Sequence, residues 1–114
     1  MPRHAVKEED KEKLMKKIML CCNAGMSTSL LVQKMQANVK ERGLDIEIEA
    51  RPMNEARDHL DGVDILLLGP QIGYAKGDFE KDVAGRIPVE VIPMADYGRM
   101  NAAGIIDAAV AKMA

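Results

Sequence analysis

Cys22 stands at the end of an apolar run, residues 18–22, and just before a stretch of small and polar residues, 23–29. A helix with a regular apolar stripe is predicted to follow. A cysteine in this place lies at the carboxyl end of a strand and faces the unpaired backbone N–H groups of a helix N-terminus. Such surroundings stabilise a thiolate, and they also bind phosphate. The pattern therefore predicts a cysteine that carries a phosphoryl group.

The residues after Cys22 are of the types that hold a phosphate. Two small residues let the backbone approach the ligand closely. Three hydroxyl side chains can cap the helix and donate hydrogen bonds to phosphate oxygens. The alternative is a buried structural cysteine at an ordinary strand end, because free cysteine is a common core residue. The predicted phosphate-binding loop consists of Asn23, Ala24, Gly25, Met26, Ser27, Thr28 and Ser29.

The other cysteine and the histidines are not expected to take part. Cys21 faces the opposite side of the strand from Cys22 and is predicted to pack as a small hydrophobe. A redox pair is not expected, because adjacent cysteines form a disulfide only with strained geometry. His59 is predicted near the amino ends of the strands, too far from Cys22 for a hydrolase dyad. Two adjacent cysteines and two scattered histidines do not match zinc spacing, so no metal site is predicted.

Strands and helices alternate along the rest of the chain, which has the length and the 47% hydrophobic content of one domain. Residues 69–77 and 93–99 are predicted to be loops. Residues 1–16 are dense in charge and are interpreted as an N-terminal arm, which leaves 17–114 as the domain. The predicted strands are 18–22, 44–50, 63–68 and 88–92, and the predicted helices are 27–42, 53–60, 78–86 and 102–113.

The order of the strands follows from their charge patterns. The first and third are almost wholly apolar, as in strands buried on both faces, whereas the second alternates and the fourth begins with proline. We therefore predict an α/β fold with three α/β/α layers and a four-stranded parallel sheet in the order 2-1-3-4, similar to low-molecular-weight cysteine phosphatases. Right-handed crossovers put the first and fourth helices on one face and the second and third on the other.

This strand order also predicts where a ligand binds. The chain leaves the first and third strands towards opposite edges, and open parallel sheets bind ligands above the carboxyl ends of such strands. The loop after Cys22 meets there with residues 69–74. From this second loop, Pro70, Gln71 and Tyr74 are predicted to lie near the site.

Composition and charge exclude several classes of function. With 16 basic and 18 acidic residues, and a net charge of −2, the chain has no electrostatic signature of nucleic-acid binding. No apolar run approaches the roughly 20 residues that span a bilayer, and residues 1–17 lack the apolar centre of a signal peptide. We expect a cytoplasmic protein that does not insert into the membrane.

A cysteine phosphatase-like hydrolase is the main alternative to a carrier. Such enzymes place an arginine six residues after the cysteine, and Thr28 occupies that position here. Asp96 could act as a general acid, but the bidentate clamp on the phosphoryl oxygens is missing. A carrier must keep its phosphoryl group, so the same absence favours a carrier. A non-catalytic regulatory module is a third possibility.

The segment 17–31, KIMLCCNAGMSTSLL, resembles the active-site segment of enzyme IIB of the bacterial sugar phosphotransferase system, of the lactose/cellobiose/chitobiose type. Further similarity lies at residues 66–72, Tyr74, residues 88–92 and Tyr97-Gly98, so the resemblance covers about 17–113. Residue by residue, it puts the phosphorylated cysteine of the family on Cys22. Cys21 departs from the family pattern, which has a large apolar residue there, and the arm is longer than usual.

The resemblance implies a protein-phosphocysteine–sugar phosphotransferase with a four-stranded parallel sheet and no cofactor or metal. Its phosphoryl donor would be a phosphohistidine of enzyme IIA, and the acceptor a sugar held by the membrane enzyme IIC. The chain would then be cytoplasmic and only transiently at the inner face of the membrane, through enzyme IIC. The identity of the sugar and the oligomeric state do not follow from the sequence.

Overall fold

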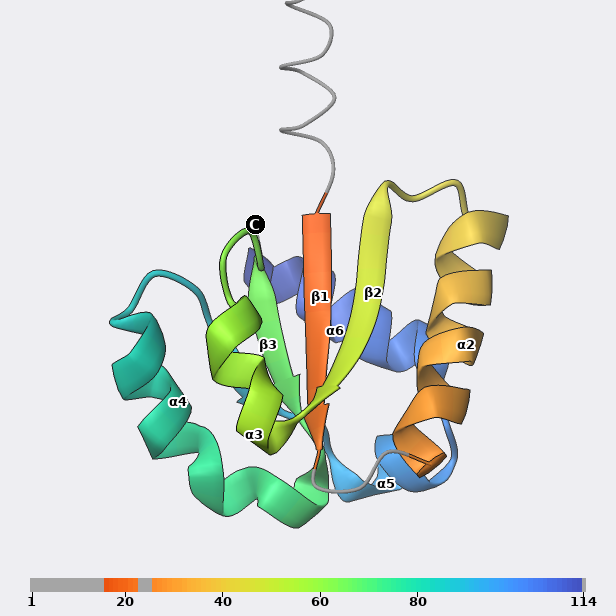
Figure 1. Ribbon diagram of the computed structural model, residues 1–114. Helices are drawn as coiled ribbons and strands as arrows, with labels where there is room; N and C mark the ends of the chain where they lie inside the picture. Colours follow the sequence, from red (N-terminus) through yellow and green to blue (C-terminus); the bar gives the residue numbers. More distant parts are fainter. Residues whose placement is uncertain (1–15, 23–25, 114) are drawn as a thin grey trace, which may run out of the picture.

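The computed structural model describes residues 16–22 and 26–113 of the chain. Helices cover both faces of a central sheet, which gives the three layers that the sequence predicts (Figure 1). The strands are β1 (Lys16–Cys22), β2 (Ile46–Pro52), β3 (Ile65–Leu68) and β4 (Val89–Val91). The α-helices are α2 (Met26–Glu41), α3 (Met53–Ala56), α4 (Lys76–Val83), α5 (Met94–Gly98) and α6 (Ala102–Met113), and the 3-10 helices are η1 (Arg57–His59) and η2 (Pro70–Ala75).

The sheet is parallel throughout and has the order β2-β1-β3-β4, which confirms the predicted order. Every residue of β3 is buried, and so is β1 from Ile18 onward, whereas the edge strand β2 buries only Ile48. The central strands are therefore the apolar ones. Charged residues are accepted at the edges because only one side of an edge strand is fully covered.

Two apolar clusters lie on the two faces of the sheet. Alternate residues of β1, Ile18 and Leu20, pack under α2 and α6. The residues between them, Met19 and Cys21, pack on the opposite face together with Phe79 of α4 and with residues of α3 and η2. This division confirms the predicted placement of the helices. It follows from the pleat, which sends successive side chains to opposite faces.

Two predicted loops contain short helices. Residues 70–75 form η2, with Pro70 in its first turn, and residues 94–98 form α5 directly after Pro93. Proline favours the start of a helix because its φ is already helical and it lacks the N–H that would stay unpaired. Helices this short do not show an apolar period. α4 ends at Val83, earlier than predicted, because Ala84 adopts a left-handed conformation with φ of 52°.

β1 begins at Lys16, whose backbone N–H donates to the carbonyl of Asp45 at 2.9 Å. The remainder of the predicted arm, residues 1–15, lies outside the described residues. Among the residues that the structure does describe, no helix combines the length and the apolar character needed to cross a membrane.

Candidate active site

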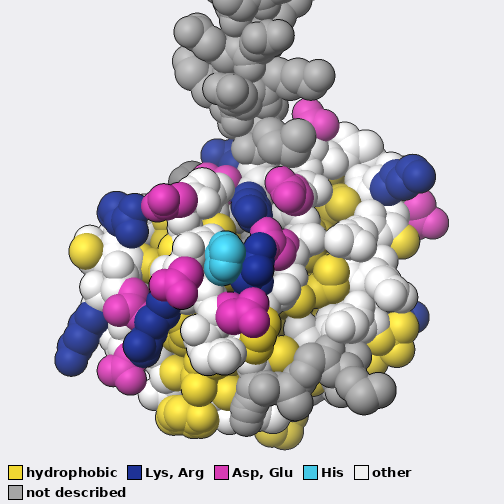
Figure 2. Space-filling model, in the orientation of Figure 1, with side chains coloured by type: hydrophobic (Ala, Val, Ile, Leu, Met, Phe, Trp, Pro, Cys, Tyr) yellow, Lys and Arg dark blue, Asp and Glu magenta, His cyan; other side chains and the backbone are white. Residues whose placement is uncertain are grey.

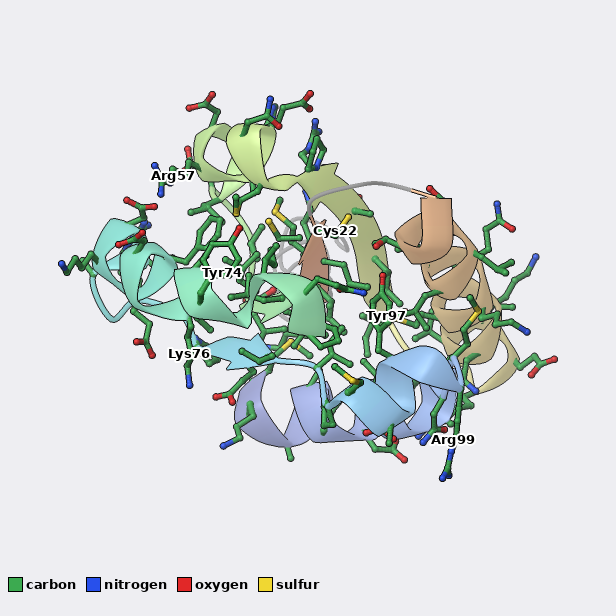
Figure 3. All side chains as sticks on the ribbon, turned by 90° about the horizontal axis from the view of Figure 1, so that it is seen from below. Cys22, Arg57, Tyr74, Lys76, Tyr97 and Arg99 are labelled. Carbon is green, nitrogen blue, oxygen red and sulfur yellow. The ribbon has the colours of Figure 1, made fainter. Side chains whose placement is uncertain are left out.

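Cys22 is the last residue of β1 and is buried, with 5% of its surface exposed. The ladder between β1 and β3 ends one residue earlier, with Cys21 opposite Leu68, and the N–H of Gly69 then donates to the carbonyl of Cys21 at 3.0 Å. Cys22 therefore lies just beyond the paired part of the two central strands. This is the carboxyl-end edge of the sheet, onto which Figure 3 looks.

The helix that follows Cys22 presents its N-terminus to the same edge. α2 begins at Met26, and its first turn contains no acidic residue, so nothing there offsets the positive end of the helix dipole. Of the predicted loop, Asn23, Ala24 and Gly25 lie outside the described residues. Met26 and Ser27 open α2, and only their backbone is described.

Thr28 and Ser29 differ in their surroundings, although both lie in the first turn of α2. Ser29 is exposed, whereas Thr28 is 1% exposed and is the one polar residue among the fully described buried side chains. The Thr28 Oγ1 lies 2.9 Å from the Tyr97 Oη of α5. A buried hydroxyl with a defined partner has one preferred orientation, which suits it for positioning a ligand.

The second predicted loop reaches the site mainly through Gly69 and Gln71. A β-carbon at Gly69 would lie 2.8 Å from the Gln71 Oε1 and 3.7 Å from the Tyr97 Cε2, so these groups crowd around the end of β3. Pro70 opens η2 next to them and is partly buried. Tyr74 is 74% exposed and lies on the same face as Cys22 and Tyr97 (Figure 3).

Tyr97 was not among the predicted site residues, although it lies at the centre of these contacts. The sequence prediction put it in a loop after the fourth strand and gave it no role. A signal was present, because the carboxyl ends of parallel strands meet at one edge and Tyr97 follows such a strand. The chain has only two tyrosines and one phenylalanine, which makes each aromatic side chain near that edge a candidate.

Cys21 is 1% exposed and packs in the cluster on the other face, as predicted. Burial, with a smaller contribution from the nearby Cys22, raises the pKa of its thiol to about 12, and Arg57 opposes the shift. A thiol with such a pKa is protonated at neutral pH, and it is therefore a poor nucleophile.

The remaining candidate acids and bases have other surroundings. His59 is exposed at the end of η1, in the segment that leads from β2 to the start of β3. Asp96 accepts a hydrogen bond from the Asn101 Nδ2 at 3.1 Å and lines a cavity beside α6 with Ile105 and Lys112. Within the described ranges, no group of three or more histidine, cysteine or acidic residues could hold a metal ion.

The fold and this edge place the chain among small three-layer α/β proteins with a cysteine at the switch point of a parallel sheet. Residues 17–108 match the model of the family described as "PTS system, Lactose/Cellobiose specific IIB subunit". The chain therefore belongs to this family of phosphotransferase-system IIB components, which confirms the resemblance seen in the sequence.

Two relatives and a solved structure agree with this family. The galactose-specific EIIB component of Lactococcus lactis subsp. cremoris is 46% identical over 101 residues, which cover 82% of this chain and 93% of that protein. The cellobiose-specific EIIB component of Lactococcus lactis subsp. lactis is 45% identical over 101 residues, which again cover 82% of this chain and 93% of that protein. The solution structure of a cellobiose-specific IIB component from Borrelia burgdorferi has a TM-score of 0.72 and 34% identity, and the match covers 87% of this chain and 92% of that one.

Proposed function

We propose that the chain is a phosphoryl carrier in which Cys22 accepts a phosphoryl group from enzyme IIA and passes it to a sugar held by the membrane enzyme IIC. The observation that carries the proposal is the position of Cys22 as the last residue of β1, before the N-terminus of α2. A helix N-terminus favours the negative charge of a thiolate and then that of the phosphoryl group.

The two transfers balance as follows. The Cys22 thiolate attacks the phosphorus of a phosphohistidine, the P–S bond forms, the P–N bond breaks, and the leaving imidazole takes up a proton. A sugar hydroxyl later attacks the same phosphorus, the P–S bond breaks, and the hydroxyl proton is released. Both steps depend chiefly on positioning and on stabilising the phosphoryl oxygens. On this proposal the chain acts as a protein-phosphocysteine–sugar phosphotransferase and needs no metal or cofactor.

The surface around Cys22 supports docking of partner proteins. Tyr74 of η2 and Met94 of α5 are 74% and 71% exposed, and hydrophobic side chains gather along the lower edge of the molecule in Figure 2, where these helices lie. In Figure 3, which looks onto the edge where Cys22 lies, Lys76 and Arg99 point away from the centre of the molecule. Exposed apolar residues bordered by cations are typical of a surface that binds another protein.

The sugar is proposed to be selected by enzyme IIC. The two Lactococcus relatives carry the names of different sugars, galactose and cellobiose, at nearly equal identity to this chain, 46% and 45%. The part of the molecule shared with both relatives is therefore compatible with either. We propose that the chain works in the cytoplasm and meets the inner face of the membrane only through enzyme IIC.

Incubation with phosphorylated enzyme IIA of a lactose/cellobiose system, followed by intact-mass measurement and peptide mapping, tests the proposal. The wild-type chain should gain one phosphoryl group, on Cys22. Cys22→Ser should gain none, because a serine hydroxyl is hardly ionised at neutral pH, whereas Cys21→Ala should still be phosphorylated. Phosphate on Cys21 would refute the assignment. Release of inorganic phosphate without a lasting adduct would indicate a hydrolase, and no reaction at all a non-catalytic module.

A further inference from the structure

Tyr97 touches the segments that follow both central strands. Its Oη lies 2.9 Å from the Thr28 Oγ1 in the first turn of α2, which is the helix after β1. Its Cε2 lies 3.7 Å from the position that a β-carbon on Gly69 would occupy, directly after β3. Tyr97 itself belongs to α5, which follows β4. One side chain thus links the segments that leave three strands at the edge where Cys22 lies (Figure 3).

The short helix that carries Tyr97 is hydrogen-bonded to Asn101, the residue that precedes α6. The backbone N–H of Asn101 donates to the Asp96 carbonyl at 2.9 Å, and the Asn101 Nδ2 donates to the Asp96 Oδ1 at 3.1 Å. The Asn101 Oδ1 accepts a bond from the N–H of Gly104 at 3.3 Å in the first turn of α6. Tyr97 therefore lies on a helix that is hydrogen-bonded through Asn101 to the start of α6.

The acidities of the two hydroxyls decide which one donates. A phenol, with a pKa of about 10, is a far stronger acid than an aliphatic alcohol. The Tyr97 O–H is therefore the favoured donor to the Thr28 Oγ1, an arrangement that leaves the Thr28 hydrogen for another acceptor. Accepting a hydrogen bond also makes a hydroxyl a better donor. Because Thr28 is 1% exposed, water competes little for this hydrogen.

We propose that Tyr97 is a positioning residue for the phosphoryl group on Cys22 and that it acts through Thr28. The inference rests on the proposed carrier function. Thr28 donates its hydroxyl hydrogen to a phosphoryl oxygen, and Tyr97 fixes the direction of that donation. Thr28 stands six residues after Cys22, where the cysteine phosphatases weighed as the alternative have an arginine, so the pair supplies a neutral, oriented donor in place of a cation. Such a donor stabilises the dianion and lowers the pKa of the bound phosphoryl group.

A ³¹P NMR pH titration of the phosphorylated protein measures this effect directly. Tyr97→Phe keeps the ring beside Gly69 and removes the hydroxyl, and Thr28→Val removes the partner hydroxyl at nearly constant shape. Each should raise the pKa of the phosphoryl group by about one unit, the size expected for one hydrogen bond to a charged group. The double variant should shift no further than Thr28→Val alone. Thr28→Ser, which keeps the hydroxyl, should titrate like the wild type.

Ile106→Val is the matched control, because Ile106 is fully buried in the apolar cluster on the same face of the sheet, and its shortening weakens the fold while both hydroxyls stay in place. It should lower the melting temperature and leave the titration unchanged. A wild-type titration curve for Tyr97→Phe, or a double variant with the sum of two separate shifts, would overturn the role of Tyr97. If Tyr97→Phe does not fold, a wild-type curve for Thr28→Val overturns it equally. A wild-type chain that takes up no phosphate would instead refute the carrier function itself.

Discussion

Cys21 and Cys22 are neighbours in the chain but differ in their chemistry because the pleat of β1 sends them to opposite sides. Cys21 packs in the cluster that includes Met19 and Leu68, under the helices on one face of the sheet. There burial raises the pKa of its thiol to about 12. Cys22 ends the strand beside the N-terminus of α2. The fold thus suppresses the ionisation of the Cys21 thiol.

The low reactivity of Cys21 can be measured in the Cys22→Ser variant, in which Cys21 is the only cysteine left. The raised pKa means that the thiolate fraction stays small until the pH approaches 12, so alkylation by iodoacetamide at pH 8 should be roughly a thousandfold slower than that of a free thiol with pKa near 8.5. The Cys22→Ser substitution removes the contribution of Cys22 to the raised pKa of Cys21, but burial, the largest cause, remains. Urea should restore the ordinary rate. Rapid alkylation of the folded variant would show that Cys21 is accessible and ionised.

At the scale of elements, the sequence predicted the order of the strands best, because buried strands are continuously apolar. The charges of β2 and the proline before β4 predict the edges of the sheet, and the apolar runs of β1 and β3 predict its centre. The helices η2 and α5 were missed because five or six residues are too few to show a 3.6-residue period. Tyr97 follows a strand that ends at this edge, but its contact with the Thr28 hydroxyl depends on α5, which the sequence prediction treated as a loop. Contacts between residues so distant in the chain leave no local pattern.

The end of α4 offers a test of backbone strain. Ala84 has φ of 52° and ψ of 38°, while its N–H bonds to the Glu80 and Lys81 carbonyls. Ala84→Gly keeps these bonds and removes the steric cost of a left-handed alanine, so urea unfolding should show a gain of about 0.5–1 kcal/mol. Ala37→Gly, at an exposed position inside α2, is the control and should lose about 1 kcal/mol. A loss for Ala84→Gly as well would show that the left-handed conformation is not strained.

At the scale of the whole molecule, the sheet is held between two apolar clusters, and ion pairs support its open β2 edge. Glu49 of β2 bonds to the Lys17 Nζ of β1 at 2.8 Å and also to the Arg51 Nε. The bond from Lys17 is the main reason that the pKa of Glu49 lies below its usual value, and partial burial opposes it. The stability of the edge therefore depends on pH.

A group with a lowered pKa in the folded state stabilises the fold above its unfolded pKa, about 4.3 for glutamate, and loses this effect as the pH falls through the folded value. The free energy of unfolding of the wild type should therefore exceed that of Glu49→Gln by about 1 kcal/mol at pH 7 and should approach it near pH 3. Urea titrations across this range provide the measurement. Glu47→Gln, at an exposed position of the same strand, should follow the wild type. A constant difference for Glu49→Gln at all pH values would contradict the assignment.

Cys22, Thr28 and Tyr97 all lie at one edge of one sheet, and Cys22 is only 5% exposed there. On the proposed function, donor and acceptor must therefore use the same narrow approach, and neither can be seated while the other occupies it. The two partners would then bind in turn at one shared site. In each turnover the dephosphorylated donor must dissociate before the acceptor can bind. Tighter binding of either partner would slow its dissociation and so lower the rate of phosphoryl transfer. Because donor and acceptor share one site, both complexes must therefore be weak and short-lived.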